Sequence, residues 1–300
     1  GWALSLDPGE GVPCAEPAPR PPLAARPFVF SVSAVELLVR DPYALYAKQI
    51  LRLSPLDPID QPPGASDRGT IIHDVLDGFV RGHMRGPLPA DAVERLIALG
   101  REAFRRFDDW PVVRSFWWPR FVEVAHWFVA EESRRRAEGI EPLAVETKGS
   151  LPLDVGGVEH VVTARADRID GRPDGYAIVI DYKTGIPPSK AQMEAGFRPQ
   201  LPLEAAMIAA GAFPEVGRRP VGAIEVWRLK GGRPPGEIKH VGDDDTDTIA
   251  AAALAGVVRL FARYRDEGQP YLSAPNPRQK GYGDYDHLAR VGEWGGEGEA

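Results

Sequence analysis

The stretch VIDYKTG (residues 179–185) ends an apolar run with an acid, an aromatic residue, a lysine, a threonine and a glycine. The run begins at YAIVI, and its lack of polar breaks is typical of a short strand buried on both faces of a sheet. Alternate side chains of an extended strand share one face, so Asp181 and Lys183 point the same way and Tyr182 points the opposite way. The stretch therefore predicts an acid and a base meeting at the carboxyl end of a buried strand.

A second acid is predicted at the end of the neighbouring strand. The segment RADRID (165–170) places Asp167 14 residues before Asp181, with the turn signal GRPDG between them. One passage from strand to turn to strand covers this separation. Two carboxylates at adjacent strand ends suit a hard cation, and Mg²⁺ or Mn²⁺ needs few protein ligands because it keeps several waters. The two segments therefore predict a cation site.

A histidine on an earlier predicted helix is the third candidate ligand. His73 lies in GTIIHDVLDGF (69–79), and its ring nitrogen would complete the ligand set. Asp77, one turn later on the same helical face, would orient His73 or a metal-bound water. The charge of Lys183 would favour an attacking hydroxide or the developing charge on a phosphate. Such a set suits metal-dependent hydrolysis of phosphodiester bonds.

The hydrophobic periodicity predicts helices in the first half of the chain and strands from residue 143 onward. Helices are expected from about residue 33, where Ser33 and Glu36 have capping-box spacing, and then at about 70–83, 91–107 and 118–138. Strands are expected at 143–153, 159–170, 176–185 and 221–229, with helices at 190–211 and 247–267. The arginine run at 134–136 is expected on a solvated helix face. The order predicts an α/β fold with an N-terminal helical region.

The composition excludes some classes of protein. The 300 residues are 43% hydrophobic, which is enough for a sizeable core, and the net charge of -7 argues against a general nucleic-acid binder while leaving room for a local basic groove. Cys14 is the single cysteine, so the chain builds no internal disulfide and no cysteine-ligated iron-sulfur cluster, and a cytoplasmic location is expected. No apolar stretch is long enough to cross a membrane. The proline-rich opening, residues 1–28, is expected to be a linker within a longer polypeptide.

Four segments in order resemble the motifs of RecB-type nucleases of the PD-(D/E)XK superfamily: GTIIHDVLDGF, RADRID, DYKTG and QLPLEAAM. The resemblance implies a β-β-β-α-β core built on a central mixed sheet. It assigns metal and catalytic roles to the histidine, the two acids and the lysine described above. It also implies that Gln200 lines the DNA-binding site and that Glu146, on the first strand, matches an acid often found there. Tyr182 and Asp77 are expected to contact DNA or to support the ligands.

The ending YGDYDHLARVGEW (282–294) looks most like the nuclease domain of AddB, which works with the AddA helicase-nuclease in bacterial double-strand-break repair. This likeness implies an Mg²⁺-dependent exonuclease that receives a single DNA strand from its helicase partner. Two features depart from the pattern: many AddB-type nucleases carry four cluster-binding cysteines where this chain has only Cys14, and Asp77 stands where relatives commonly have glutamate. The expected divisions are a helical part at 29–140, a catalytic core at 143–267, an extension at 268–294 and a tail at 295–300.

Other interpretations remain open at this point. DYKTG by itself could be a solvated strand end with Lys183 in a surface ion pair, and His73 could be an ordinary core histidine. The joint order of four motifs favours a nuclease over these readings. Within the nuclease fold, the alternatives are a stand-alone RecB-like exonuclease of a CRISPR-type system and a catalytically silent DNA-binding or scaffold module. The chain has no P-loop motif, so it is not itself the motor.

Overall fold

A mixed six-stranded sheet forms the centre of the computed structural model, which describes residues 15–56, 62–241, 245–273, 275 and 283–294. The strand order is β1-β3-β4-β5-β6, and β2 pairs with β3 outside this path. Strand β4 runs parallel to β5, whereas β2–β3, β3–β4 and β5–β6 are antiparallel. The strands are β1 Val29–Ser31, β2 Glu141–Asp154, β3 Glu159–Gly171, β4 Ala177–Lys183, β5 Val221–Leu229 and β6 Gly236–Val241. The predicted α/β class and the β-β-β-α-β order are confirmed.

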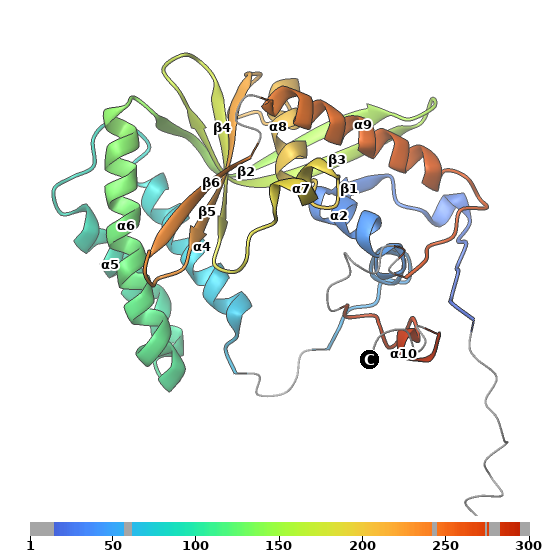
Figure 1. Cartoon of the computed structure of the whole chain (residues 1–300), viewed down its shortest axis with the longest axis horizontal. Helices are drawn as coiled ribbons and strands as arrows, with labels where there is room; N and C mark the ends of the chain where they lie inside the picture. Colours follow the sequence, from blue (N-terminus) through green and yellow to red (C-terminus); the bar gives the residue numbers. More distant parts are fainter. Residues whose placement is uncertain (1–14, 57–61, 242–244, 274, 276–282, 295–300) are drawn as a thin grey trace, which may run out of the picture.

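Helices cover both faces of this sheet (Figure 1). One layer contains α4 Ala65–Arg81, α5 Ala92–Phe104 and α6 Trp118–Ala137, and the other contains α2 Val32–Arg40, α8 Gln200–Ala210 and α9 Thr246–Tyr264. Strand β4 alternates between the two layers, since Ile178 and Ile180 pack with the α4–α6 layer while Ala177 and Val179 pack with the α8 layer. The continuous apolar run of β4 follows from burial on both sides.

The shorter helical segments connect these layers. They are η1 Leu23–Ala25, α3 Pro42–Leu45, the π-helical η2 Tyr46–Ile50, η3 Arg105–Phe107, the π-helical η4 Val113–Trp117, α7 Lys190–Glu194 and α10 Val291–Trp294.

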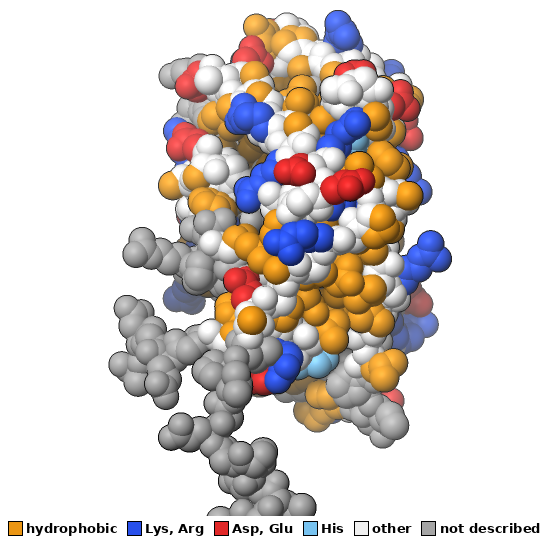
Figure 2. Space-filling view, turned by 90° about the vertical axis from the view of Figure 1, so that its right-hand side faces the viewer, with side chains coloured by type: hydrophobic (Ala, Val, Ile, Leu, Met, Phe, Trp, Pro, Cys, Tyr) orange, Lys and Arg blue, Asp and Glu red, His pale blue; other side chains and the backbone are white. Residues whose placement is uncertain are grey.

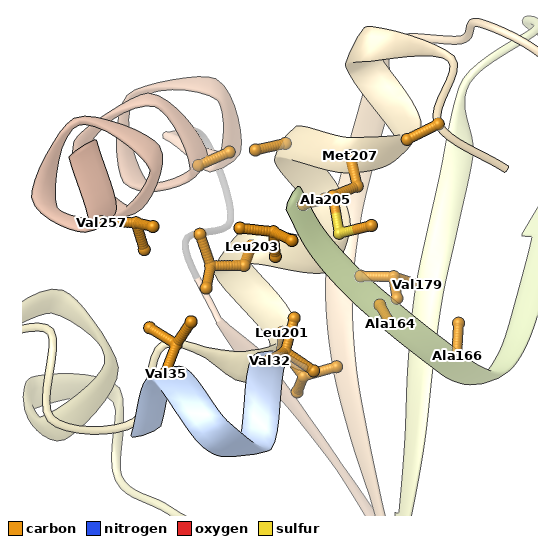
Figure 3. Packing of buried hydrophobic residues seen from close by; sticks show 14 of the residues in the cluster. Val32, Val35, Ala164, Ala166, Val179, Leu201, Leu203, Ala205, Met207 and Val257 are labelled. Atoms are coloured by element: carbon orange, nitrogen blue, oxygen red, sulfur yellow. The ribbon is translucent and has the colours of Figure 1, made fainter. Parts of the chain in front are cut away.

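Small residues let α8 approach the sheet closely. Figure 3 shows Leu201, Leu203 and Met207 of α8 packed between β3 and the helices α2 and α9. The β3 residues beneath them are Ala164 and Ala166, both buried. Because alanine has no side chain beyond Cβ, it leaves room for the helix backbone to come near the strand. This packing carries the first turn of α8 to the end of β4.

The helix predicted at 190–211 is interrupted. Helix α7 ends at Glu194 and α8 begins at Gln200. Gly196 adopts the left-handed conformation with φ of +77°, which an L-residue rarely adopts, and Pro199 follows shortly after it. The break gives Gln200 a place on the first turn of α8. The predicted capping box at Ser33 is also wrong, because the Oγ of Ser31 accepts the cap hydrogen bond from Ala34 and the helix starts at Val32.

Two of the six strands were not predicted. Strand β1 has three residues, too few for a periodic signal, and it pairs with β3 in parallel. Strand β6, GEIKHV, pairs with β5 at the edge of the sheet and carries exposed polar side chains. Both lie at margins of the sheet, where partial burial leaves no clear hydrophobic alternation.

The arginine run at 134–136 is mostly buried, so the predicted solvated face holds for Arg134 only. The Arg135 guanidinium donates to Asp170 at 3.0 Å and to Glu225 at 3.0 Å, and all three side chains are almost fully buried. Arg168 joins the same network through Asp170 at 2.5 Å. Charges are removed from water only when they are paired, and here each arginine meets a carboxylate.

Candidate metal centre

The two predicted acids lie opposite each other at the ends of β3 and β4. Arg168 pairs with Ile180 in the antiparallel ladder, so the next position sets Asp167 against Asp181. The backbone N–H of Tyr182 donates to the Oδ2 atom of Asp167 at 2.9 Å. Strand pairing therefore brings together two carboxylates that are far apart in the printed sequence.

A histidine and a second acid complete a compact group around Asp167. Helix α4 packs on β2 and brings the Nδ1 atom of His73 to 3.5 Å from Oδ2 of Asp167. Glu146 lies between the pairs that flank it on β2, and so faces Asp167 across the ladder. One ligand atom from each of His73, Glu146 and Asp167 lies within 4.8 Å of the others. Three groups at this spacing can share one cation.

Glu146 adopts a backbone conformation that is uncommon for a residue with a side chain. Its φ of +49° lies in the left-handed region, in the middle of strand β2. Such strain persists only where the surroundings hold it and is concentrated at functional sites. Burial and the charge of Asp167 raise the pKa of Glu146, while Arg165 pairs with it and acts in the opposite direction. The sequence motif pointed to Glu146, but the strain was not foreseeable from it.

Asp181 and Lys183 share one face, as the alternation predicted. Lys183 Nζ donates to Asp181 Oδ1 at 2.7 Å, and Asp181 is 2% exposed. Burial raises the pKa of Asp181 to about 6; Lys183 opposes this shift and the charge of Asp167 adds to it. The second oxygen, Oδ2, is buried and has no hydrogen-bond partner among the residues that the structure describes. A buried carboxylate oxygen without a partner is costly, and a cation would remove that cost.

The donor set fits a hard divalent cation. It offers carboxylate oxygens from Asp167, Asp181 and Glu146 and one imidazole nitrogen from His73, which suits Mg²⁺ or Mn²⁺. The predicted ligands were His73, Asp167 and Asp181. The group of possible ligands that lie within 4.8 Å of one another in the described part of the chain contains Glu146 in place of Asp181. Asp181 lies nearby, since its pKa responds to the charges of Asp167 and His73. Cys14, on which the absence of an iron-sulfur cluster was argued, lies outside the described residues.

The first turn of α8 adds an amide and an acid to the same site. Gln200 Nε2 donates to Glu204 Oε1 at 3.2 Å and lies 3.4 Å from Oδ1 of Asp181. Glu204 is buried, and burial together with the charges of Asp181 and Asp167 raises its pKa well above the usual range. Glu204 was not among the predicted site residues, although its i, i+4 spacing from Gln200 puts both on one helical face.

Two predicted residues have other surroundings than expected. Asp77 pairs with Arg81 at 2.9 Å, and among the described residues no hydrogen bond joins it to His73. Arg81 also donates to the carbonyl of Val145, so this pair ties α4 to β2 beside the site. The Tyr182 side chain is buried on the opposite face of β4, where its hydroxyl accepts a hydrogen bond from an arginine of the buried network. Tyr182 was expected either to contact DNA or to support a metal ligand. Because its side chain is buried, the second role remains, through the hydrogen bond that its backbone N–H donates to Asp167.

The family assignment follows from a match over most of the chain. The model of the PD-(D/E)XK nuclease superfamily matches residues 29–278, which include every residue of the site described above. The chain belongs to the PD-(D/E)XK nuclease superfamily.

The chain is similar to several curated rickettsial proteins, which are named as uncharacterised. The chain is 30% identical to one from Rickettsia bellii over 187 residues, which are 62% of this chain and 22% of that protein. Proteins from Rickettsia felis and Rickettsia conorii are 30% identical over 190 residues, again 62% of this chain, and 22% and 23% of their lengths are matched. The chain therefore spans about a fifth of the length of these relatives.

Among solved structures, the crystal structure of SSO0001 covers 78% of this chain and 77% of its own, with 12% identity and a TM-score of 0.31. A likeness at this level adds nothing to the assignment. Within the described residues, the helices are too short or too polar to span a bilayer.

Proposed function

We propose that this chain is a metal-dependent deoxyribonuclease domain that hydrolyses DNA phosphodiester bonds as an exonuclease. The observation that carries the proposal is the convergence of His73, Glu146 and Asp167 within 4.8 Å, next to the ion pair of Asp181 and Lys183. The superfamily match supports a nuclease, and the unpartnered oxygen of Asp181 supports a cation. A bound Mg²⁺ would supply Lewis acidity and activate water, the two needs of this reaction.

Lys183 acts in this scheme as a fixed positive charge. Burial alone would lower its pKa, but the carboxylates of Asp181 and Asp167 outweigh burial and raise it. The ammonium therefore stays protonated at neutral pH and cannot serve as a general base. Its side chain is 35% exposed, which leaves its outer side free to meet a phosphate and to stabilise negative charge that develops there.

Gln200 and Glu204 position the carboxylate of Asp181. Burial and the charges of Asp181 and Asp167 raise the pKa of Glu204, which favours its neutral form beside the three other carboxylates of the site. Gln200 spans Glu204 and Asp181, and so limits how the Asp181 carboxylate can turn. The backbone N–H of Tyr182, which donates a hydrogen bond to Asp167, limits the rotation of the Asp167 carboxylate in the same way. Both acids are thereby held for shared ligation.

The likeness of the C-terminal segment to AddB leads us to place the domain in an AddAB-type helicase-nuclease of the cytoplasm, acting on double-strand-break ends. An AddA-like partner would deliver a single DNA strand. Delivery by a partner accounts for a nuclease with a net charge of -7, because a local contact then suffices for binding. On the face shown in Figure 2, basic and acidic side chains of the described residues are interspersed rather than separated.

The test is cleavage of single-stranded DNA labelled at its 5′ or 3′ end, with Mg²⁺ and with EDTA. The parent chain is compared with Asp181→Ala and Lys183→Ala, and with Lys239→Ala on edge strand β6 as a matched lysine control. We expect cutting that needs the metal, survives Lys239→Ala and is lost in both site variants while their circular dichroism stays native. Cutting at the parental rate in both site variants would overturn the site, and a parent that binds DNA yet never cuts, even with a helicase partner, would favour the silent scaffold.

A further inference from the structure

The β2–β3 hairpin carries three successive rows of polar side chains that start at the metal centre. Cross-strand pairing sets Lys148 opposite Arg165 and Ser150 opposite Thr163. Each row is two residues further along both strands than the last, so the two outer rows face the same side of the hairpin, and the ion pair between Arg165 and Glu146 links them to the metal centre. The rows, from the metal centre outward, are Glu146 with Asp167, Lys148 with Arg165, and Ser150 with Thr163.

The middle row places two cations directly across from each other. Like charges at such positions destabilise an antiparallel ladder, and both side chains are exposed to solvent. Arg165 pairs with Glu146, but among the described residues no carboxylate lies within ion-pair distance of Lys148. The row of Lys148 and Arg165 destabilises the ladder, and the Lys148 ammonium has no carboxylate partner among the described residues. An anion that binds from solution would offset both costs.

The two outer rows, Lys148 with Arg165 and Ser150 with Thr163, line one open hollow of about 710 Å³. Its walls also include Ser31 and Ser33 at the start of α2, and Gln200 of the metal site. The hollow thus begins at the residues that hold Asp181 and continues along the hairpin. No aromatic side chain is among its lining residues in the described part of the chain, so bases have nothing to stack on there.

We infer that this hollow seats the sugar-phosphate backbone of the single strand beside the scissile bond, with one phosphate held between Lys148 and Arg165. The inference rests on the proposed function and adds a substrate-binding surface to it. Successive rows lie about 6.6 Å apart, because each strand rises about 3.3 Å per residue and each row advances by two residues. This spacing is comparable to that of successive phosphates in an extended strand. One phosphate at the metal centre therefore puts its neighbour at the cationic row, and the hydroxyls of Ser150 and Thr163 meet the next one.

The test uses binding of a fluorescent 20-mer of thymidine and of a mixed-sequence 20-mer to the 300-residue chain in EDTA, between 50 and 200 mM salt. We expect Lys148→Ala to weaken binding about tenfold at low salt, the loss of one charged contact. The slope of log affinity against log salt should fall by about 0.7, the change for one phosphate on a single strand. Lys148→Ala should lower the affinity for both oligonucleotides by the same factor. The reason is that the seat, formed by Lys148 and Arg165, contacts the sugar-phosphate backbone and not the bases.

Two further variants separate the seat from general effects. Lys239→Ala, an exposed lysine on β6, should leave both affinity and slope unchanged. Ser150→Lys adds a cation to the next row and should tighten binding severalfold with a steeper slope, a gain that misfolding cannot produce. In Mg²⁺, Lys148→Ala should raise KM and leave kcat near parental.

The seat is overturned if Lys148→Ala binds with parental affinity and slope, if Lys239→Ala has the same effect as Lys148→Ala, or if the parent does not bind at 50 mM salt. The proposed nuclease function has a separate readout. If Lys148→Ala changes nothing while Asp181→Ala still abolishes cleavage, the function stands and only the seat falls. If the parent binds DNA and never cleaves it, even with a helicase partner, the function itself falls.

Discussion

Asp181→Asn should make the metal-free chain more stable at pH 8 while abolishing its response to Mg²⁺. Burial raises the pKa of this carboxyl from the usual 3.8 to about 6, so at pH 8 the native state holds a buried charge that the unfolded chain exposes to water. Asparagine keeps the shape and removes the charge. The same change removes the oxygen that has no partner and that a cation would satisfy.

The magnitude follows from the pKa. At 1.36 kcal/mol per pH unit, the change from 3.8 to about 6 corresponds to about 3 kcal/mol of unfolding free energy. The pKa of about 6 already includes the favourable interaction with Lys183, so this figure is the net gain. At about 2.1 cal/mol/K of unfolding entropy per residue, a gain of about 3 kcal/mol raises Tm by about 5 °C in a chain of 300 residues.

The pH dependence has a definite sign. Because the native pKa lies above the unfolded one, the native parent chain retains a proton between about pH 4 and pH 6 that its unfolded state has released. The parent therefore loses stability relative to the variant as pH rises through this window. The difference should be absent below pH 4 and complete at pH 8.

The assay is thermal unfolding followed by circular dichroism, in EDTA and in 10 mM Mg²⁺, at several pH values. Mg²⁺ should raise the Tm of the parent at pH 8, because a ligand that binds only the native state stabilises it by mass action, and should leave the variant unchanged. A variant that is less stable than the parent at pH 8 in EDTA would refute the reasoning. So would an equal rise of Tm with Mg²⁺ in both proteins.

Three further outcomes are expected, each measured by denaturant or thermal unfolding in EDTA. Arg135→Met removes the arginine that pairs with the buried Glu225 and leaves Asp170 with Arg168 alone; it should cost about 3–5 kcal/mol, and a loss below about 1 kcal/mol would contradict the buried network. Gly100→Ala brings a Cβ to 2.0 Å from the Phe121 ring and should cost about 1–3 kcal/mol. Gly78→Ala, with open space around its Cβ on helix α4, should be neutral or stabilising. Equal effects of the two substitutions would refute the packing of Gly100 against Phe121. Burial raises the pKa of Glu204, so its ionised form destabilises the native state; Glu204→Gln, which cannot ionise, should therefore not lower Tm at pH 7, and a marked fall would contradict the raised pKa.

The core of the site could be predicted because its signals are local. Strand alternation is enough to put Asp181 and Lys183 on one face, and the spacing of RADRID from DYKTG is enough to pair two strand ends. The role of His73 needed the joint order of motifs, since a lone histidine on a helix carries no such information. The structure adds that these residues meet, with His73 3.5 Å from Asp167.

The remainder depends on contacts that the sequence does not encode locally. Arg135 and Glu225 are 90 residues apart and meet only because α6 packs on β5, so the run at 134–136 gave no sign of burial. Glu146 enters the tightest ligand group through a left-handed backbone turn inside a strand, which propensity does not predict for glutamate. The pKa of Glu204 is raised only because the fold buries this side chain beside other acids.

The most direct test of the account is an anomalous difference map from crystals of the chain grown with Mn²⁺. The account predicts one strong peak bounded by His73, Asp167 and Asp181, with carboxylate oxygens about 2.0–2.3 Å from the ion, and Glu146 either bound to it or one water away. Diffraction from Asp181→Asn crystals should show that peak weakened or gone. A map without a peak at this position, or with Mn²⁺ bound elsewhere while these side chains stay metal-free, would contradict the account.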